Sequence, residues 1–445
     1  MEEPIKIDVP SDVIRIIRTV EAAGYEAYAV GGCVRDALLG RTAHDWDVTT
    51  SAKPEIIKSL FEHTVDTGIK HGTVTVLQGK TGYEVTTYRL DGIYLDGRHP
   101  EKVEYTSLLS EDLKRRDFTI NAMAYHPQKG LVDLFDGRKD LENRVIRCVG
   151  NPIERFTEDA LRMMRAVRFS AQLDFSVEEK TQAAIKMLCA NIRKVSHERI
   201  ADELIKTITS EHPERFLNMY ELGLTRYIMP EFDRMVACTQ NNRYHCYTVG
   251  IHTIKVLENV PADKVLRLAA LLHDVGKLTT KTVENGTDHF FGHCIESVRI
   301  GRGILKNLKL DNDTINKVCI LIRHHDPEFP PTENGVRRLM HEVTPALMPA
   351  LIALMRADVE GKSSAARLTA GNIDLYEKLY KEIEERGDCI YIKDLAVSGS
   401  DLINVGVKKG EDIGKCLNNL LEIVMDEPEK NKKETLLNIV KNEYL

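Results

Sequence analysis

Apolar and polar positions follow two different spacings along the chain. Up to about residue 145, short runs with the alternating pattern of strands follow one another in turn with helical patterns. From Arg155 onward almost every apolar run has helical spacing. In the first part the pattern predicts strands at Ala27–Val30, Trp46–Thr50, Thr73–Leu77 and Tyr83–Tyr88, and helices at Val34–Leu39 and Pro54–Phe61. In the second part it predicts helices that include Asp159–Leu173, Glu178–Cys189, Glu198–Ile208 and Val265–His273. We therefore predict an α+β head followed by an all-helical body.

The length of 445 residues implies several domains, because one domain spans roughly 100–200 residues. We expect a head over residues 1–147, a helical neck over 148–215, and a helical body and tail over 216–445. The composition, 42% hydrophobic and 29% charged, is typical of a soluble globular protein. The sequence has no signal peptide at its start, no apolar run of roughly 18 residues, and nine cysteines without CxxC spacing. These features predict a cytoplasmic protein with reduced thiols and no membrane partner.

The net charge of −7 weighs against a nucleic-acid partner, although a local basic face can coexist with an acidic remainder. Basic residues gather between positions 138 and 168, namely Arg138, Lys139, Arg144, Arg147, Arg155, Arg162, Arg165 and Arg168. The last three recur every third residue, so they lie on one side of a predicted helix. The charge alone therefore does not exclude binding of RNA.

A glycine pair joins the first predicted strand to the next helix, in the segment Gly31-Gly32-Cys33-Val34-Arg35-Asp36. Glycines let the backbone approach a phosphate closely, and a helix N-terminus supplies N–H donors. Tight turns also use such pairs, so this segment alone is compatible with either a phosphate loop or a plain turn.

Two aspartates, Asp45 and Asp47, stand two positions apart at the start of a predicted strand. Alternate residues of a strand face the same way, so the two carboxylates would share one face. Like charges that close repel each other unless a cation neutralises them, and two Mg²⁺ ions would do so while clamping a triphosphate for in-line displacement. Glu84, on a later strand, is a candidate third carboxylate or an ordinary exposed strand residue.

The segments GGCVRDALLG and HDWDVTTSA resemble motifs of the DNA polymerase beta superfamily, specifically those of class II tRNA nucleotidyltransferases and bacterial poly(A) polymerases. The resemblance continues through Tyr88-Arg89, RRDFTINAMA at 115–124, DLFDG at 133–137 and RFTEDALR at 155–162, and covers about residues 25–175. It implies a DNA polymerase beta-like head of mixed sheet and helices. It also implies template-independent addition of C, C and A to the tRNA acceptor end from CTP and ATP.

The resemblance implies a role for each residue that matches a family motif. By that resemblance Gly32 and Arg35 hold the triphosphate, Asp45 and Asp47 bind Mg²⁺, Arg116 contacts the nucleotide, Asp117 and Asn121 shape the ribose pocket, Asp159 and Arg162 read the base, and Arg165 and Arg168 support phosphates. With Glu84, the two aspartates make up the predicted catalytic set.

Base reading by Asp159 and Arg162 also follows from chemistry. Residues three apart on a helix point the same way, and the pair combines an acceptor with a fork of donors. Cytosine and adenine each present an amino donor beside an unprotonated ring nitrogen, whereas uracil and guanine present a carbonyl beside a ring N–H. A mismatch costs about 1–3 kcal/mol per unsatisfied group, so the pair selects C and A.

One pocket must then serve two bases in turn. The family resemblance assigns part of this switch to a mobile loop, which corresponds here to Leu90–Pro100, a segment rich in glycine and polar residues. Its full length favours complete CCA addition over CC addition, although an ordinary surface loop would have the same composition.

The helical half carries a second constellation, which begins with His252 and continues with His273-Asp274 before Val-Gly-Lys. It resembles the HD phosphohydrolase superfamily, and places an HD domain at about residues 245–360. The resemblance implies that His252, His273, Asp274 and Asp358 bind one divalent ion, whose identity the ligands do not fix. His293 with His324 or His325 is the candidate set for a second ion, and Lys277 is either a phosphate contact or a surface lysine.

The leading hypothesis is a CCA tRNA nucleotidyltransferase, with phosphohydrolase activity at the HD site as a possible addition. A poly(A) polymerase and a partial CC-adding enzyme are the alternatives with the same head. From other classes, the chain could be an HD phosphohydrolase or an RNA-binding module with an inactive head. The intact Asp45, Asp47, Asp159 and Arg162 argue against an inactive head.

Overall fold

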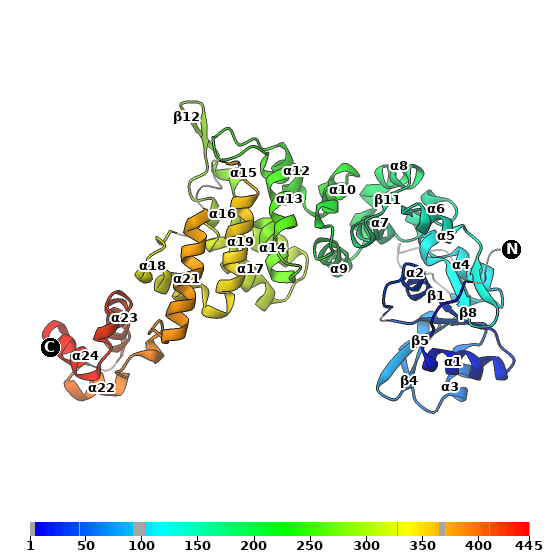
Figure 1. Ribbon diagram of the computed structural model, residues 1–445, viewed down its shortest axis with the longest axis horizontal. Coiled ribbons are helices and arrows are strands. Elements are labelled where there is room, and N and C mark those ends of the chain that lie inside the picture. The colour runs from blue at the N-terminus through cyan, green and yellow to red at the C-terminus, as the bar shows by residue number, and fades with distance from the viewer. Residues whose placement is uncertain are drawn as a thin grey trace. The chain divides into compact units, whose positions relative to one another are not determined.

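The computed structural model describes residues 5–43, 45–91, 103–326, 328–364, 370–408 and 410–444. The chain divides into two compact units, Met1–Pro230 and Glu231–Leu445 (Figure 1). The predicted switching loop Leu90–Pro100 lies outside the described residues from Gly92 onward.

A mixed sheet forms the head of the first unit. Its described strands are, in spatial order, β3 (Thr64–Gly68), β4 (Thr73–Gln78), β5 (Thr81–Thr87), β2 (Val48–Thr50), β1 (Ala27–Val30), β8 (Met123–His126) and β9 (Gly130–Asp133). Strands β2 and β5 are parallel, and the other neighbours are antiparallel. The predicted α+β head with a mixed sheet is confirmed.

The register of the central strands brings separate acidic positions together. Val48 of β2 pairs with Val85 of β5, and both side chains are buried in the core. Asp47 and Glu84 are the residues just before this pair, so Glu84, in the middle of β5, lies beside Asp47 where β2 begins. Glu84 also lies opposite Thr75 of β4.

Helices surround this sheet and continue beyond it within the first unit. They are α1 (Ser11–Ala22), α2 (Gly32–Leu38), α3 (Pro54–Leu60), α4 (Leu109–Lys114), α5 (Gly137–Glu142), α6 (Pro152–Glu158), α7 (Leu161–Leu173), α8 (Glu179–Leu188), α9 (His197–Ile208), α10 (Phe216–Glu221) and α11 (Thr225–Ile228). Two short strand pairs accompany them, β6 (Arg89–Asp91) with β7 (Val103–Tyr105) and β10 (Val145–Ile146) with β11 (Ser176–Val177). Helices α7 and α9 pack against each other, and α7 buries most of its residues.

Three predicted boundaries need correction. The first helix begins at Gly32 rather than Val34, because Gly31 adopts a φ of +84° that starts the turn early. The second strand begins at Val48, so Asp45 and Asp47 precede the strand instead of lying on it. Asp159 is extended, with φ −139° and ψ 105°, and therefore lies between α6 and α7 rather than on one long helix.

The second unit is almost wholly helical. Its described helices are α12 (Pro230–Ala237), α13 (Val249–Asn259), α14 (Lys264–Leu272), α15 (Lys277–Thr280), α16 (His293–Asn307), α17 (Asn312–His324), α18 (Glu333–Val343), α19 (Met348–Glu360), α21 (Ala370–Arg386), α22 (Gly399–Val405), α23 (Glu411–Asp426) and α24 (Lys433–Tyr444). A short hairpin, β12 (Thr282–Glu284) with β13 (Thr287–His289), precedes α16. Helices α13, α14, α16, α17 and α19 pack on one another, and α22–α24 enclose a separate apolar core. Among the described residues, no helix combines the length and apolarity needed to cross a bilayer.

Candidate functional site

Three carboxylates line one cavity of the head. Asp45, Asp47 and Glu84 surround a space of about 610 Å³ together with Thr75 and Tyr83. Burial, and then the negative charge of Glu84 and Asp45, raises the pKa of Asp47 to about 6, although Arg116 opposes the shift. Glu84 and Asp45 therefore add negative charge around Asp47, which Arg116 opposes. An all-oxygen donor set of this kind fits a hard divalent cation such as Mg²⁺.

The glycine pair lies beside this cluster. The Val30 amide donates to the Asp47 carbonyl oxygen at 3.0 Å, so Gly31 and Gly32 follow directly after the residue that contacts Asp47. A side chain at Gly31 would bring its Cβ within 3.0 Å of the Arg116 guanidinium. The turn thus requires glycine both for its positive φ and for this close approach.

Arginine side chains gather next to the glycine turn. Arg35 is buried, donates to Asn121 Oδ1 at 2.7 Å, and pairs with Asp36. The buried Nε of Arg116 has no hydrogen-bond partner among the described residues. An unsatisfied buried donor beside a carboxylate cluster is a position that an anionic phosphate would complete.

Asp117 connects the segment 115–124 of the head to helix α7. Its carboxylate accepts from Asn121 Nδ2 at 3.2 Å and from Arg165 Nε at 2.8 Å. Burial opposes ionisation, but Arg165 and its neighbours outweigh it and lower the pKa of Asp117 to about 2. Asp117 is therefore an anchor for Arg165, and the structure brings Arg116, Asp117, Asn121 and Arg165 together as neighbours.

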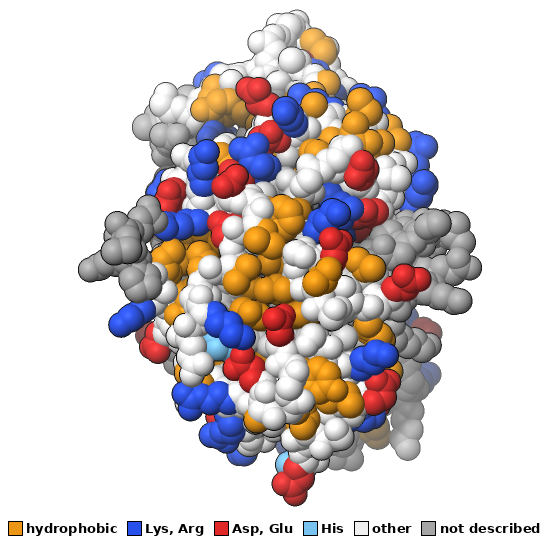
Figure 2. Space-filling view, turned by 90° about the vertical axis from the view of Figure 1, so that its right-hand side faces the viewer, with side chains coloured by type: hydrophobic (Ala, Val, Ile, Leu, Met, Phe, Trp, Pro, Cys, Tyr) orange, Lys and Arg blue, Asp and Glu red, His pale blue; other side chains and the backbone are white. Residues whose placement is uncertain are grey.

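The basic stretch predicted between residues 138 and 168 is not a free basic face. Arg147 pairs with Asp140, Arg165 with Asp117 and Arg168 with Glu203. The guanidinium groups of Arg35, Arg165 and Arg168 lie 4.2–5.3 Å from the ring centre of Phe169. Burial lowers the pKa of Arg168 to about 10 despite Glu203. Figure 2, which views the end of the molecule at the right of Figure 1, shows Lys and Arg interspersed with Asp and Glu on the described part of that face.

The two residues predicted to read the base each have a protein partner. Asp159 accepts from Arg199 of α9 at 2.7 Å, and its other carboxylate oxygen accepts from the Leu161 amide at 3.0 Å. Arg162 is buried and donates to Glu158 at 2.7 Å and to the Arg115 carbonyl at 3.0 Å. The two side chains flank the same turn but do not rise from one helix face, because Asp159 is extended.

Arg199, which sequence reasoning did not single out, contacts the proposed base-reading residue Asp159. It lies 40 positions from its partner Asp159, and no local spacing in the sequence connects the two. Only the packing of α9 on α7 brings them together.

The HD residues form a buried cluster in the second unit. His252 Nε2 lies 2.9 Å from Asp358 Oδ1 and 3.4 Å from His273 Nε2, while Asp274 Oδ2 lies 3.4 Å from His273 Nε2. Although burial alone would lower it, Asp274 and Asp358 raise the pKa of His273 to about 9. The carboxylates of Asp274 and Asp358 thus favour positive charge within the cluster, which a divalent metal would supply.

A second group adjoins the first through Asp274. The Oδ1 atom of Asp274 lies 3.6 Å from His293 Nε2 and 3.8 Å from His325 Nε2. His325, and not the half-buried His324, therefore joins His293, and Cys294 lies beside both. Asp274 is positioned to bridge two ions.

The histidine rings are oriented for Nε2 coordination. In each ring Nδ1 faces a backbone carbonyl, of Gly361 for His252, Ala270 for His273, Phe290 for His293 and Ile322 for His325, at 2.8–3.2 Å. Such a contact fixes the tautomer with the proton on Nδ1 and leaves Nε2 free for a metal. These four carbonyl contacts are the main reason to conclude that the histidines fit a divalent ion.

Two lysines complete the cluster. Lys277 is buried, so the alternative of a surface lysine is wrong; its Nζ lies 2.7 Å from Asp274 Oδ2. Lys362, which sequence reasoning missed, pairs with Asp358 from one turn further along the chain. Together with His293 and Arg323 they line a cavity of about 330 Å³.

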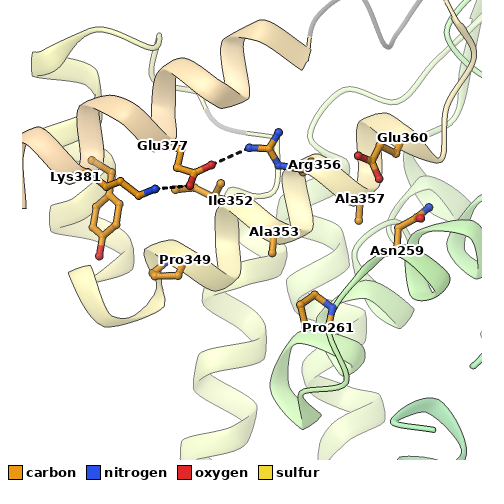
Figure 3. A pocket seen from close by; sticks show the side chains of 11 residues that line it. Asn259, Pro261, Pro349, Ile352, Ala353, Arg356, Ala357, Glu360, Glu377 and Lys381 are labelled. Atoms are coloured by element: carbon orange, nitrogen blue, oxygen red, sulfur yellow. Dashed lines mark hydrogen bonds and ion pairs between the residues drawn. The ribbon is translucent and has the colours of Figure 1, made fainter. Parts of the chain in front are cut away.

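Another cavity of the second unit lies against helix α19. Figure 3 shows the second space, of about 340 Å³, bounded by Ile352, Arg356 and Glu360 of α19. Arg356 is 200° from Asp358 around an ideal helix, about the opposite side. Its charge is already neutralised by Asp374 and Glu377, and Lys381 also pairs with Glu377. Asp358, the candidate metal ligand on α19, therefore lies on the side of the helix away from Arg356.

Family models match successive parts of the chain. They are described as "Poly A polymerase head domain" over residues 27–147, "Probable RNA and SrmB- binding site of polymerase A" over 174–236, "HD domain" over 242–380 and "tRNA nucleotidyltransferase domain 2" over 367–440. The order agrees with the predicted head, helical regions and HD domain.

Individual proteins match over nearly the full length. The CCA-adding enzyme of Levilactobacillus brevis is 37% identical over 423 residues, which cover 95% of each chain. That of Pediococcus pentosaceus is 36% identical over 434 residues, covering 96% of this chain and 97% of the relative.

Solved structures agree. The Bacillus stearothermophilus CCA-adding enzyme in complex with CTP has a TM-score of 0.73 and 28% identity, over 99% of both chains. The Thermotoga maritima CCA-adding enzyme complexed with tRNA, at 20% identity and a TM-score of 0.61 over 98% of this chain and 96% of that one, supports the fold. Given relatives above 30% identity that extend over almost the entire sequence, the chain belongs to the family of CCA-adding enzymes.

Proposed function

We propose that this chain is a CCA tRNA nucleotidyltransferase, which adds C, C and A to the tRNA 3′ end from CTP and ATP without a nucleic-acid template. The observation that carries the proposal is the cluster of Asp45, Asp47 and Glu84 beside the glycine turn and Arg116. Membership of the CCA-adding family supports it. The substrates are thus the tRNA acceptor end and the two triphosphates.

In the proposed reaction the primer 3′-hydroxyl attacks the α-phosphate of CTP or ATP, and pyrophosphate leaves. Asp45 and Asp47, with Glu84, would hold Mg²⁺, which supplies charge neutralisation and activation of the hydroxyl when bound. Arg35 and Arg116 would bind the triphosphate oxygens and stabilise the charge that develops there. Gly32 leaves the backbone open to the phosphates.

Base selection is proposed to rest on Asp159 and Arg162. Asp117 and Asn121 would shape the ribose pocket, while Arg165 and Arg168 would support nucleotide or primer phosphates. Because Asp159 and Arg162 are held by Arg199 and Glu158, an incoming base meets oriented groups rather than mobile ones. Oriented groups discriminate more sharply, since a wrong base leaves a buried donor or acceptor unpaired.

The test uses purified protein, Mg²⁺ and a tRNA transcript that lacks its last three nucleotides. Each labelled triphosphate is supplied singly, then CTP with ATP, and the products are sized on a gel. Growth by three nucleotides that then stops is the expected result. Two nucleotides from CTP and no A would indicate a CC-adding enzyme, a long ladder from ATP alone would indicate a poly(A) polymerase, and no incorporation would contradict the proposal.

Arg199 provides a specific prediction. Replacing it with Ala should lower kcat/KM for CTP about tenfold, mainly through KM, and should weaken rejection of UTP, because Asp159 loses a charged hydrogen bond. Steady-state kinetics with CTP and UTP measure both effects. Arg199→Lys should recover part of the loss, whereas Lys206→Ala, an exposed change on the same helix, should have none. Unchanged UTP rejection in Arg199→Ala would show that Asp159 needs no such support.

A second activity, metal-dependent phosphoester hydrolysis at the HD site, is favoured by the Nδ1 contacts of the four histidines. We propose that His252, His273, Asp274 and Asp358 hold one divalent ion, and that Asp274, His293 and His325 hold another. A bound metal there supplies hydroxide at neutral pH. Lys277 and Lys362 keep Asp274 and Asp358 ionised and orient them, since both lysines pair directly with these carboxylates.

A further inference from the structure

Phe291 is unusually exposed for an aromatic side chain. With 75% of its surface accessible, it is the most exposed of the large apolar side chains in the described part of the chain. Burial of a phenylalanine normally contributes to stability, so an exposed ring gains little for the fold. Packing in the core therefore does not account for a phenylalanine at position 291.

The ring is nevertheless held in place. It stacks on His289 at the end of β13, with the planes inclined by only 10° and the centroids 5.4 Å apart. Directly after it, Gly292 takes a φ of +73° and starts α16 at His293. Phe291 thus stacks on His289 and stands two residues before the proposed metal ligand His293 in the sequence.

Its location connects the ring to the HD cluster. Phe291 lines the same cavity of about 330 Å³ as Asp274, His293 and His325. The walls of this cavity also include Lys277, Lys362 and Arg323. An aromatic face thus stands at the exposed edge of a cavity whose floor is suited to an anionic phosphoester and its metal ions.

This combination matches a nucleotide, which has an anionic phosphate and a flat aromatic base. Protein aromatic rings bind bases by stacking, with little dependence on which base is present. A phosphorylated peptide or an inorganic polyphosphate would make no such use of an exposed ring. We propose that Phe291, backed by His289, is a base-stacking platform of the HD site, which holds the base of a ligand whose phosphate lies in the cavity.

The inference rests on the proposed hydrolytic function of the HD site, and its test separates the two. The probe is 2-aminopurine riboside 3′-monophosphate, whose fluorescence is quenched when the base stacks. Binding to the full-length protein loaded with divalent metal is followed by stopped flow, before turnover. Inorganic phosphate, which has no base, is measured in parallel by titration calorimetry.

Wild-type protein should quench the probe, and Phe291→Ala should remove the quenching and weaken probe binding about tenfold. Phe291→Trp should retain both. Val283→Ala, which changes an exposed residue of the adjacent β12 strand, should leave both unchanged. Binding of the probe to the head contributes equally to all variants and is measured by competition with CTP.

Phosphate affinity distinguishes the remaining outcomes. Equal phosphate affinity in wild type and Phe291→Ala, with the probe weakened only in the variant, supports the stacking role. Equal quenching and affinity for the probe in both proteins would overturn it while the hydrolytic proposal stands. If neither phosphate nor the probe binds outside the head, both proposals fail.

Discussion

Asp47→Asn is expected to lower kcat for nucleotide addition about 10³-fold or more, without lowering the unfolding temperature of the protein. The variant removes a carboxylate that would hold Mg²⁺. It also relieves repulsion, because burial and the charges of Glu84 and Asp45 already raise the pKa of Asp47 to about 6. The variant should therefore lose activity while its unfolding temperature stays the same or rises.

The measurements are single-nucleotide incorporation with CTP and thermal unfolding of the same preparation. Asp66→Asn is the matched control, since Asp66 is an exposed carboxylate of β3 that pairs with Lys58 at the surface. It should retain full activity. Substantial incorporation by Asp47→Asn would mean that the carboxylate cluster is not the transfer site.

Asp274→Asn is expected to empty the HD site of divalent metal and to leave CCA addition within about twofold of wild type. Asp274 lies between both histidine groups, so its loss removes a ligand from each. It also strips the buried Lys277 of its carboxylate, and breaking a buried ion pair costs about 3–5 kcal/mol. The variant should therefore unfold at a lower temperature.

Metal content by elemental analysis and unfolding with and without EDTA measure these effects. A bound metal stabilises the folded state by linkage, so EDTA should lower the unfolding temperature of wild type but not of Asp274→Asn. Asp313→Asn, an exposed change on α17, should behave as wild type. An equal response to EDTA in the two proteins would exclude Asp274 as a metal ligand.

The local parts of the site were predictable because their signals are local. Gly31 and Gly32 are consecutive, and Asp45 and Asp47 stand two positions apart, so the spacing within each pair carries the chemistry. The HD residues were likewise marked by the adjacent pair His273-Asp274 at the end of an apolar helix. In both cases residue type and short-range spacing were sufficient.

The sequence did not predict contacts that depend on packing. The extended conformation of Asp159 follows from a break between α6 and α7, which helical periodicity does not reveal. Arg199 meets Asp159 only because α9 packs on α7, and Lys362 is marked by no motif. The choice of His325 over its neighbour His324 depends on helix rotation at the end of α17, which one residue of boundary error would reverse.

The parallel pairing of β2 with β5 has a consequence for how the protein tolerates insertions. Asp47 and Glu84 meet only because Val48 and Val85 share a register. A single residue inserted between Glu84 and Val85 would keep the valine pairing but turn Glu84 to the opposite face of the sheet, since side chains alternate along a strand. Length changes should therefore be excluded from this part of β5 over evolution, while substitutions at positions of β5 other than Glu84 and the buried Val85 are accepted more readily. Related sequences should show this bias as a block free of gaps around Glu84.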